Sequence, residues 1–87
     1  MKVEIDEQFE KDLRRLRTED AKLTWKIWEL LFDLYRTPFD GIGKPEPLKS
    51  GYRGCWSRRI DQKHRLIYRI ENDIVTLISC FGHYDDD

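Results

Sequence analysis

The sequence has little of what marks a secreted, metal-binding or membrane-spanning protein. Its two cysteines, Cys55 and Cys80, lie far apart with no CxxC or His-rich spacing, so we expect both to be buried small hydrophobic residues and expect no metal site. No apolar run approaches the ~20 residues that span a bilayer. The opening MKVEIDEQFEKD is acidic and lacks the apolar centre of a signal peptide. We therefore expect a cytoplasmic protein without membrane contact, metal or other cofactor.

An excess of charge of one sign is also missing, because 16 Lys and Arg face 17 Asp and Glu in 87 residues. This length predicts a single domain, residues 1–87. Hydrophobic content of 39% and aromatic content of 13% argue against disorder, although 38% of the residues are charged. The three acids that follow Tyr84, residues 85–87, are expected to form a disordered tail.

The near-zero total charge hides a basic segment. Residues 49–69, KSGYRGCWSRRIDQKHRLIYR, hold seven Lys and Arg against one Asp, whereas the other 66 residues hold nine basic and 16 acidic side chains. A local excess of this size attracts polyanions. The alternative is an ordinary solvated strand surface.

The first half of the chain predicts one strand and two helices. The alternating KVEI indicates a short strand, after which Asp6 is a plausible N-cap for a helix with the apolar stripe Phe9, Leu13 and Leu16. Thr18, followed by two acids, is expected to cap a second helix that runs to about Tyr35.

The second helix carries two apolar stripes. One consists of Leu23, Ile27, Leu30, Leu31 and Leu34, and must pack on a sheet. The other is rich in aromatic residues and includes Trp25, Trp28 and Phe32. This aromatic stripe either lies under the first helix or stays open as a partner interface.

The second half predicts a long loop and three strands. Residues 36–54 hold all three prolines and four of the five glycines, and a loop of this length in a small domain is often functional. CWSRRI, RLIYRI and IVTLISCF then have strand composition and are joined by short turns. We therefore predict an α+β fold of order β-α-α-β-β-β, with two helices packed on one face of an antiparallel sheet.

Alternation along RLIYRI places Arg65 and Arg69 on the face away from the helices, which we expect to be open and suited to single-stranded nucleic acid. Whether Arg58 or Arg59 shares this face depends on the length of the hairpin loop. A loop with an odd number of residues centred on Gln62 would put Arg59 opposite Arg65. A loop with an even number of residues would place Arg58 on this face instead.

Three kinds of side chain suggest a reaction. The loop GKPEPLK fixes the carboxylate of Glu46 between two prolines, and the chain ends with His83 and Tyr84 after a strand. A carboxylate, an imidazole and an arginine are the groups that metal-free RNA cleavage needs, for removing the 2′-hydroxyl proton, steadying the phosphate and protonating the leaving 5′-oxygen. Taken singly, Glu46 and His83 are equally explained as a solvated loop acid and a terminal histidine without a role.

The stretch TPFDGIGKPEPLKSGYRGCWSRRIDQKHRLIY, together with the near-terminal HY, resembles the YoeB/Txe group of bacterial toxins in the RelE superfamily. The motifs TPF-x-G-x-GKPEPLK, WSRRI and HRL-x-Y, in this order and spacing, are more specific than any single residue, and the element order agrees with that superfamily. The resemblance implies a toxin of a type II toxin-antitoxin system: a metal-independent endoribonuclease that cleaves messenger RNA in the ribosomal A site.

The resemblance also implies roles for individual residues. It makes Glu46 the general base, Arg65 the residue that steadies the phosphate and His83 the general acid, while Tyr84 positions the RNA. Phosphate-binding positions of the family are matched by Lys49 and Arg59, with Arg58 as the less certain neighbour.

The partners implied are messenger RNA on the ribosome and a YefM-like antitoxin. A homodimer or an antitoxin helix would use the surface of Trp25, Trp28 and Phe32. Two other functions compete with the enzyme: a non-catalytic inhibitor of the same fold, as in the gyrase-inhibiting ParE branch, and an RNA-binding module in which Trp56 or Tyr52 stacks on bases.

Overall fold

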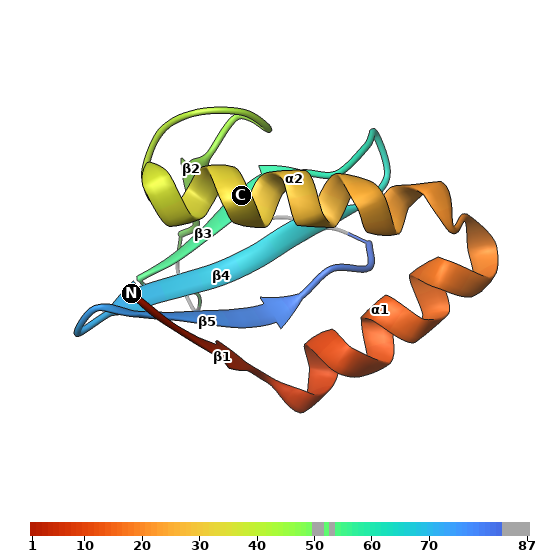
Figure 1. Cartoon of the computed structure of the whole chain (residues 1–87), viewed down its shortest axis with the longest axis horizontal. Coiled ribbons are helices and arrows are strands. Elements are labelled where there is room, and N and C mark those ends of the chain that lie inside the picture. The colour runs from red at the N-terminus through yellow and green to blue at the C-terminus, as the bar shows by residue number, and fades with distance from the viewer. Residues whose placement is uncertain (50–51, 53, 83–87) are drawn as a thin grey trace.

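The protein, described here from a computed structural model that covers residues 1–49, 52 and 54–82, has two helices on a five-stranded sheet (Figure 1). The sheet order is β1-β5-β4-β3-β2. The elements are β1 (Lys2–Ile5), α1 (Glu7–Glu19), α2 (Lys22–Arg36), β2 (Glu46–Pro47), β3 (Cys55–Arg59), β4 (Arg65–Glu71) and β5 (Ile74–Ser79). The predicted order β-α-α-β-β-β is confirmed, with the two-residue β2 added inside the predicted loop.

The sheet is mixed, because β1 pairs in parallel with β5 and sets Lys2 opposite Ile74. The pairs β2–β3, β3–β4 and β4–β5 are antiparallel, as predicted from their short connections. At the β4–β5 turn, Asn72 and Asp73 both have positive φ, 52° and 61°. A two-residue hairpin turn of this hand needs positive φ at both positions, which Asn and Asp tolerate.

The start of α1 agrees with the sequence, but the start of α2 does not. Asp6 caps α1 and accepts a hydrogen bond from the Gln8 N–H at 2.8 Å. Thr18 lies inside the last turn of α1, where its hydroxyl donates to the carbonyl of Arg14, so the prediction that it caps α2 is wrong. Asp20 accepts from the Lys22 N–H at 3.2 Å instead. Within the described residues, no helix is both long and apolar enough to cross a membrane.

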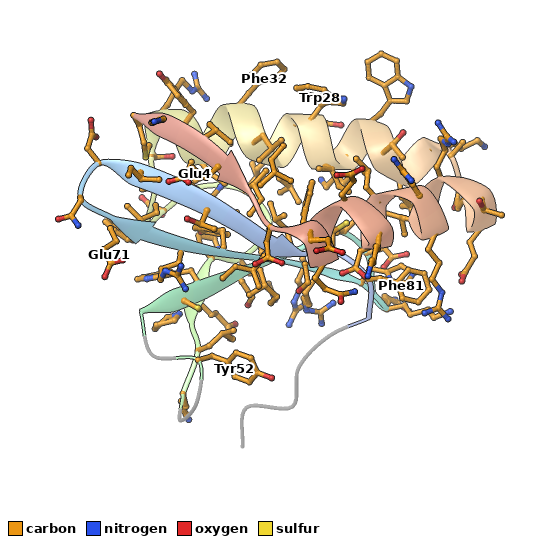
Figure 2. The ribbon with its side chains drawn as sticks, turned by 90° about the horizontal axis from the view of Figure 1, so that it is seen from below. Glu4, Trp28, Phe32, Tyr52, Glu71 and Phe81 are labelled. Carbon is orange, nitrogen blue, oxygen red and sulfur yellow. The ribbon has the colours of Figure 1, made fainter. Side chains whose placement is uncertain are left out.

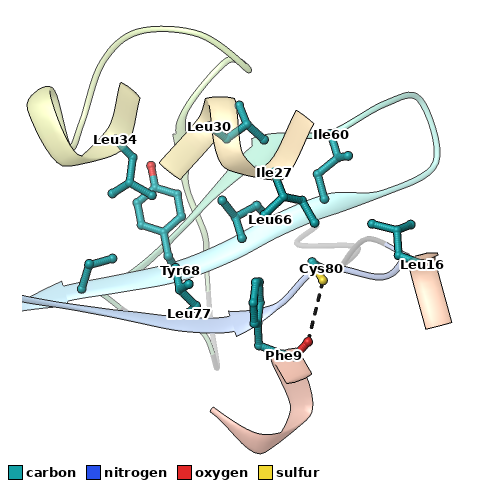
Figure 3. Packing of buried hydrophobic residues seen from close by; sticks show 11 residues of the cluster. Phe9, Leu16, Ile27, Leu30, Leu34, Ile60, Leu66, Tyr68, Leu77 and Cys80 are labelled. Carbon is teal, nitrogen blue, oxygen red and sulfur yellow. Dashed lines mark hydrogen bonds between the residues drawn. The ribbon is translucent and has the colours of Figure 1, made fainter. Parts of the chain in front are cut away.

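The core lies between the helices and the near face of the sheet (Figure 3). Phe9 and Leu16 of α1 and the buried stripe of α2 meet Leu66, Tyr68 and Leu77 there. Both cysteines are buried, as predicted. Burial, and secondarily the charge of Asp12, raise the pKa of the Cys80 thiol to about 12, so this thiol stays protonated near neutral pH and acts in packing.

The aromatic stripe of α2 is open. Trp25 is 73% exposed and Phe32 67% exposed, and Trp28 is also exposed. Figure 2 shows Trp28 and Phe32 on the side of α2 away from the sheet. The alternative in which this stripe lies under the first helix is therefore wrong.

Candidate functional site

The register of three neighbouring strands brings the predicted base and two predicted phosphate-binding residues to one face of the sheet. Glu46 of β2 lies opposite Ser57 of β3, and Arg59 of β3 lies opposite Arg65 of β4. Cross-strand partners share a face, as do residues two apart on one strand. Glu46, Arg59 and Arg65 therefore project from the face of the sheet opposite the helices.

The loop between β3 and β4 fixes this register. Five residues, 60–64, separate the two strands and are centred on Gln62, so the odd-numbered alternative is the correct one. Arg59 is exposed on the site face, while Arg58 lies opposite Leu66 and points into the core.

Arg58 is a structural residue, and the prediction that it binds phosphate is wrong. Its side chain is 0% exposed, and its five guanidinium N–H groups are all used inside the protein. It donates to the Asp33 carboxylate at 2.6 Å and to the Tyr68 hydroxyl at 3.1 Å. The remaining three bonds go to the carbonyls of Thr37, Asp40 and Ile42.

Asp33 completes this network from α2 and was missed at the sequence level. Its carboxylate also accepts from the Ile42 N–H at 2.9 Å. That backbone bond, followed by the bond from Arg58, holds the pKa of Asp33 below its ordinary value. The available signal was an acid within the apolar run LLFDL of the second helix, which indicates a buried partner.

The Arg58 network shapes the loop that leads to Glu46. Its carbonyl acceptors all lie within residues 37–42, and Gly43 then accepts a backbone bond from Arg59 at 2.6 Å. Lys44 follows with a left-handed backbone, and the chain enters β2 at Glu46, which is exposed. The buried Arg58 thus fixes the conformation of the loop that leads to Glu46, the predicted base.

Arg65 is held close to the end of the described chain. Its N–H donates to the carbonyl of Gly82 at 2.8 Å, and its Nη1 donates to the carbonyl of Asp61 at 2.8 Å. Lys49 lies exposed beyond β2. The predicted residues His83 and Tyr84 lie outside the described residues.

The site face is less open than predicted. Arg65 and Arg69 are half-buried there, and Ile67 between them is only 1% exposed. Figure 2 shows Tyr52 on this side of the sheet, away from α2. Among the described residues, no group of three or more His, Cys, Asp or Glu is placed to hold a metal ion.

The arrangement offers a proton acceptor beside fixed positive charge. Arg59 and Arg65 carry the positive charge that attracts a phosphodiester, and arginine pairs well with phosphate through its planar donors. A carboxylate next to a bound phosphodiester can take a proton from a neighbouring hydroxyl. The site therefore has the chemistry of a phosphodiester-cleaving or phosphodiester-binding surface.

Comparison with known proteins shows which toxins this chain is similar to. Toxin YoeB of Escherichia coli K12 is 43% identical over 84 residues, which are 97% of this chain and 100% of the relative. A YoeB/ParE toxin from Agrobacterium tumefaciens has a similar structure, with a TM-score of 0.90 and 40% identity over 97% of this chain and 100% of that one.

Two structures of YoeB from Staphylococcus aureus are similar as well. One is a heterotetrameric YoeB-YefM toxin-antitoxin complex, with a TM-score of 0.84, and the other a YoeB dimer, with a TM-score of 0.86. Each is 38% identical over 97% of this chain and 98% of that one. Residues 5–84 also match a family described as the YoeB-like toxin of bacterial type II toxin-antitoxin system. The chain therefore belongs to the YoeB-like toxins of bacterial type II toxin-antitoxin systems.

Proposed function

We propose that this toxin is a ribosome-dependent endoribonuclease that cleaves messenger RNA in the A site. The observation that carries the proposal is the shared face of Glu46, Arg59 and Arg65, set by the β2–β3–β4 register. A non-catalytic inhibitor of the same fold has no need for a carboxylate at this place. The proposed activity belongs in the cytoplasm, where its target is translated.

The proposed reaction is a transfer within the RNA. Glu46 removes the proton of a ribose 2′-hydroxyl, and the 2′-oxygen forms a bond to the adjacent phosphorus. Arg65, with Arg59 and Lys49, stabilises the charge on the phosphate oxygens. The bond to the 5′-oxygen breaks, and His83 protonates that oxygen. The products are a 2′,3′-cyclic phosphate and a 5′-hydroxyl. None of the proposed steps uses a metal ion.

The proposal is tested by adding the purified toxin to ribosomes that translate a defined messenger, and mapping the ends by primer extension. We expect cuts within the A-site codon, with 5′-hydroxyl ends that kinase labels directly, and little cutting of the same messenger without ribosomes. An intact messenger, together with growth arrest on expression, would contradict the enzyme and favour the non-catalytic inhibitor. Salt-sensitive binding without cutting would favour the RNA-binding module.

We further propose that a YefM-like antitoxin covers an apolar groove between β1, α1 and α2. The groove has a volume of about 590 Å³, and its 12 lining residues are all apolar or aromatic. Trp28 and Phe32 line it on α2, with their ring centroids 6.0 Å apart. An antitoxin is the favoured occupant because the similar toxin from S. aureus forms a heterotetramer with YefM.

Trp28→Glu combined with Phe32→Glu is expected to weaken antitoxin binding at least 100-fold, because aromatic residues at the centre of an interface often contribute about 2 kcal/mol or more each. Lys22→Glu is the control, since it changes the net charge equally on the same helix but lies outside the groove. Affinity is measured by calorimetry and mass by light scattering. Unchanged affinity with a loss of dimer mass would show that a second copy of the toxin occupies the groove.

A further inference from the structure

The backbone of Gly82 is held on both sides by two consecutive residues, the last of the β3–β4 loop and the first of β4. Its N–H donates to Nδ1 of His64 at 2.8 Å, and its carbonyl accepts from the N–H of Arg65 at 2.8 Å. The residue that precedes the proposed acid is thereby attached directly to the backbone of the proposed phosphate-binding arginine.

His64 is itself firmly placed. It is 2% exposed, and its N–H donates to the carboxylate of Asp61 at 2.6 Å, while its carbonyl accepts from Ile60. Its ring packs on Phe81 at a centroid distance of 4.4 Å. The guanidinium carbon of Arg15, on α1, lies 4.0 Å from the centre of the Phe81 ring. The imidazole is thus a fixed acceptor rather than a mobile surface group.

The chemistry of the contact requires a particular state of the ring. Because the Gly82 N–H donates to Nδ1, that nitrogen must present its lone pair, so the ring proton resides on Nε2. Gly82 has φ of +71°, and an added Cβ would meet nothing within 4 Å. The glycine is therefore needed for its left-handed backbone rather than for space.

We propose that His64 is a positioning residue for the general acid. This inference rests on the proposed function, in which His83 protonates the leaving 5′-oxygen. His83 is the next residue in the chain after Gly82. Fixing Gly82 against Arg65 sets where the acid-bearing segment begins relative to the phosphate, and displacements near 1 Å can cost about 100-fold in rate.

His64→Leu removes the acceptor and keeps an apolar side chain of similar size. We expect the single-turnover rate on ribosome-bound messenger to fall about 10- to 100-fold, with the concentration for half-maximal rate little changed. His64→Asn should recover most of the rate, because its amide oxygen occupies the bonded position of Nδ1. His64→Gln, whose oxygen corresponds to Nε2, should behave like the leucine variant and repeats the test with a polar side chain.

A change of leaving group separates positioning from simple stabilisation of the fold. A messenger with sulfur in place of the 5′-oxygen at the cut site releases a thiolate, which needs no protonation because thiols have a pKa near 8.5. We expect His83→Ala and His64→Leu to be slow on the normal messenger and close to wild type on the sulfur-substituted one. Val75→Ala, which opens a void in the core near the start of β5, should show no such dependence on the leaving group.

The outcomes distinguish this inference from the function on which it rests. If the sulfur messenger does not restore His83→Ala, His83 is not the acid and the positioning role of His64 falls with it, whereas A-site cutting by the wild-type toxin would still support the proposed ribonuclease. If it restores His83→Ala but leaves His64→Leu and His64→Gln slow, the acid assignment stands and the positioning role of His64 is wrong. Equal rates of His64→Asn and His64→Leu on the normal messenger would also overturn it.

Discussion

Glu46→Gln is expected to lower the rate of A-site cleavage by about 10²- to 10⁴-fold, the usual contribution of a general base. Glutamine keeps the size and polarity of the side chain but cannot accept the 2′-hydroxyl proton. Glu46 is exposed in β2, with Pro45 before it and Pro47 after it, so glutamine at this position leaves the fold unchanged and such a loss reports on the reaction. The measurement is a single-turnover cleavage assay on ribosome-bound messenger with the toxin in excess.

Glu71→Gln provides the matched control. Glu71 is also an exposed acid at the end of a strand, but it lies at the far end of β4 from Arg65. This variant should cleave at the wild-type rate. If Glu46→Gln kept a rate within twofold of wild type, Glu46 would not be the base, although the toxin could still be an endoribonuclease that uses another proton acceptor.

Much of the fold follows from local patterns. The stripe of Phe9, Leu13 and Leu16, the cap at Asp6 and the alternation along β4 each depend on residues within a few positions of one another. Such signals determine an element wherever its burial is one-sided. They therefore gave the correct order and the correct core face of α2.

The errors occur where distant residues decide the structure. The parallel pairing of β1 joins Lys2 to Ile74, and no local pattern specifies that partner. The strand β2 is two residues long and includes Pro47, which cannot donate to a ladder, so its composition gives almost no strand signal. At Thr18 the local cap preference lost to a hydrogen bond with the preceding turn.

The sequence could predict which kinds of residue form the candidate site, but not which of two adjacent arginines belongs to it. The sequence indicated that Glu46 and an arginine of WSRRI act together, yet a register shift of one residue exchanges Arg58 with Arg59. The five-residue loop after β3 decides between them. His64 was not singled out because its role depends on Gly82, 18 residues later.

Arg58→Met should destabilise the protein by about 3–5 kcal/mol, the usual cost of removing one partner of a buried ion pair. The change leaves the Asp33 carboxylate without its cation and the Tyr68 hydroxyl without one of its donors. It also leaves the carbonyls of Thr37, Asp40 and Ile42 without the N–H groups that they accept from. Urea unfolding followed by tryptophan fluorescence measures the loss.

Arg59→Met is the control because it makes the same replacement at the next residue. Arg59 is exposed and lies across from Arg65, where two like charges face each other. Its loss should change the free energy of unfolding by no more than about 0.5 kcal/mol, while weakening cleavage through the lost phosphate contact. Equal urea midpoints for the two variants would contradict the structural role of Arg58. We expect Arg58→Met to be much less stable than Arg59→Met, and Arg59→Met to be folded but poorly active. That result would show that Arg58 holds the loop before Glu46 in place, whereas the adjacent Arg59 contacts the substrate.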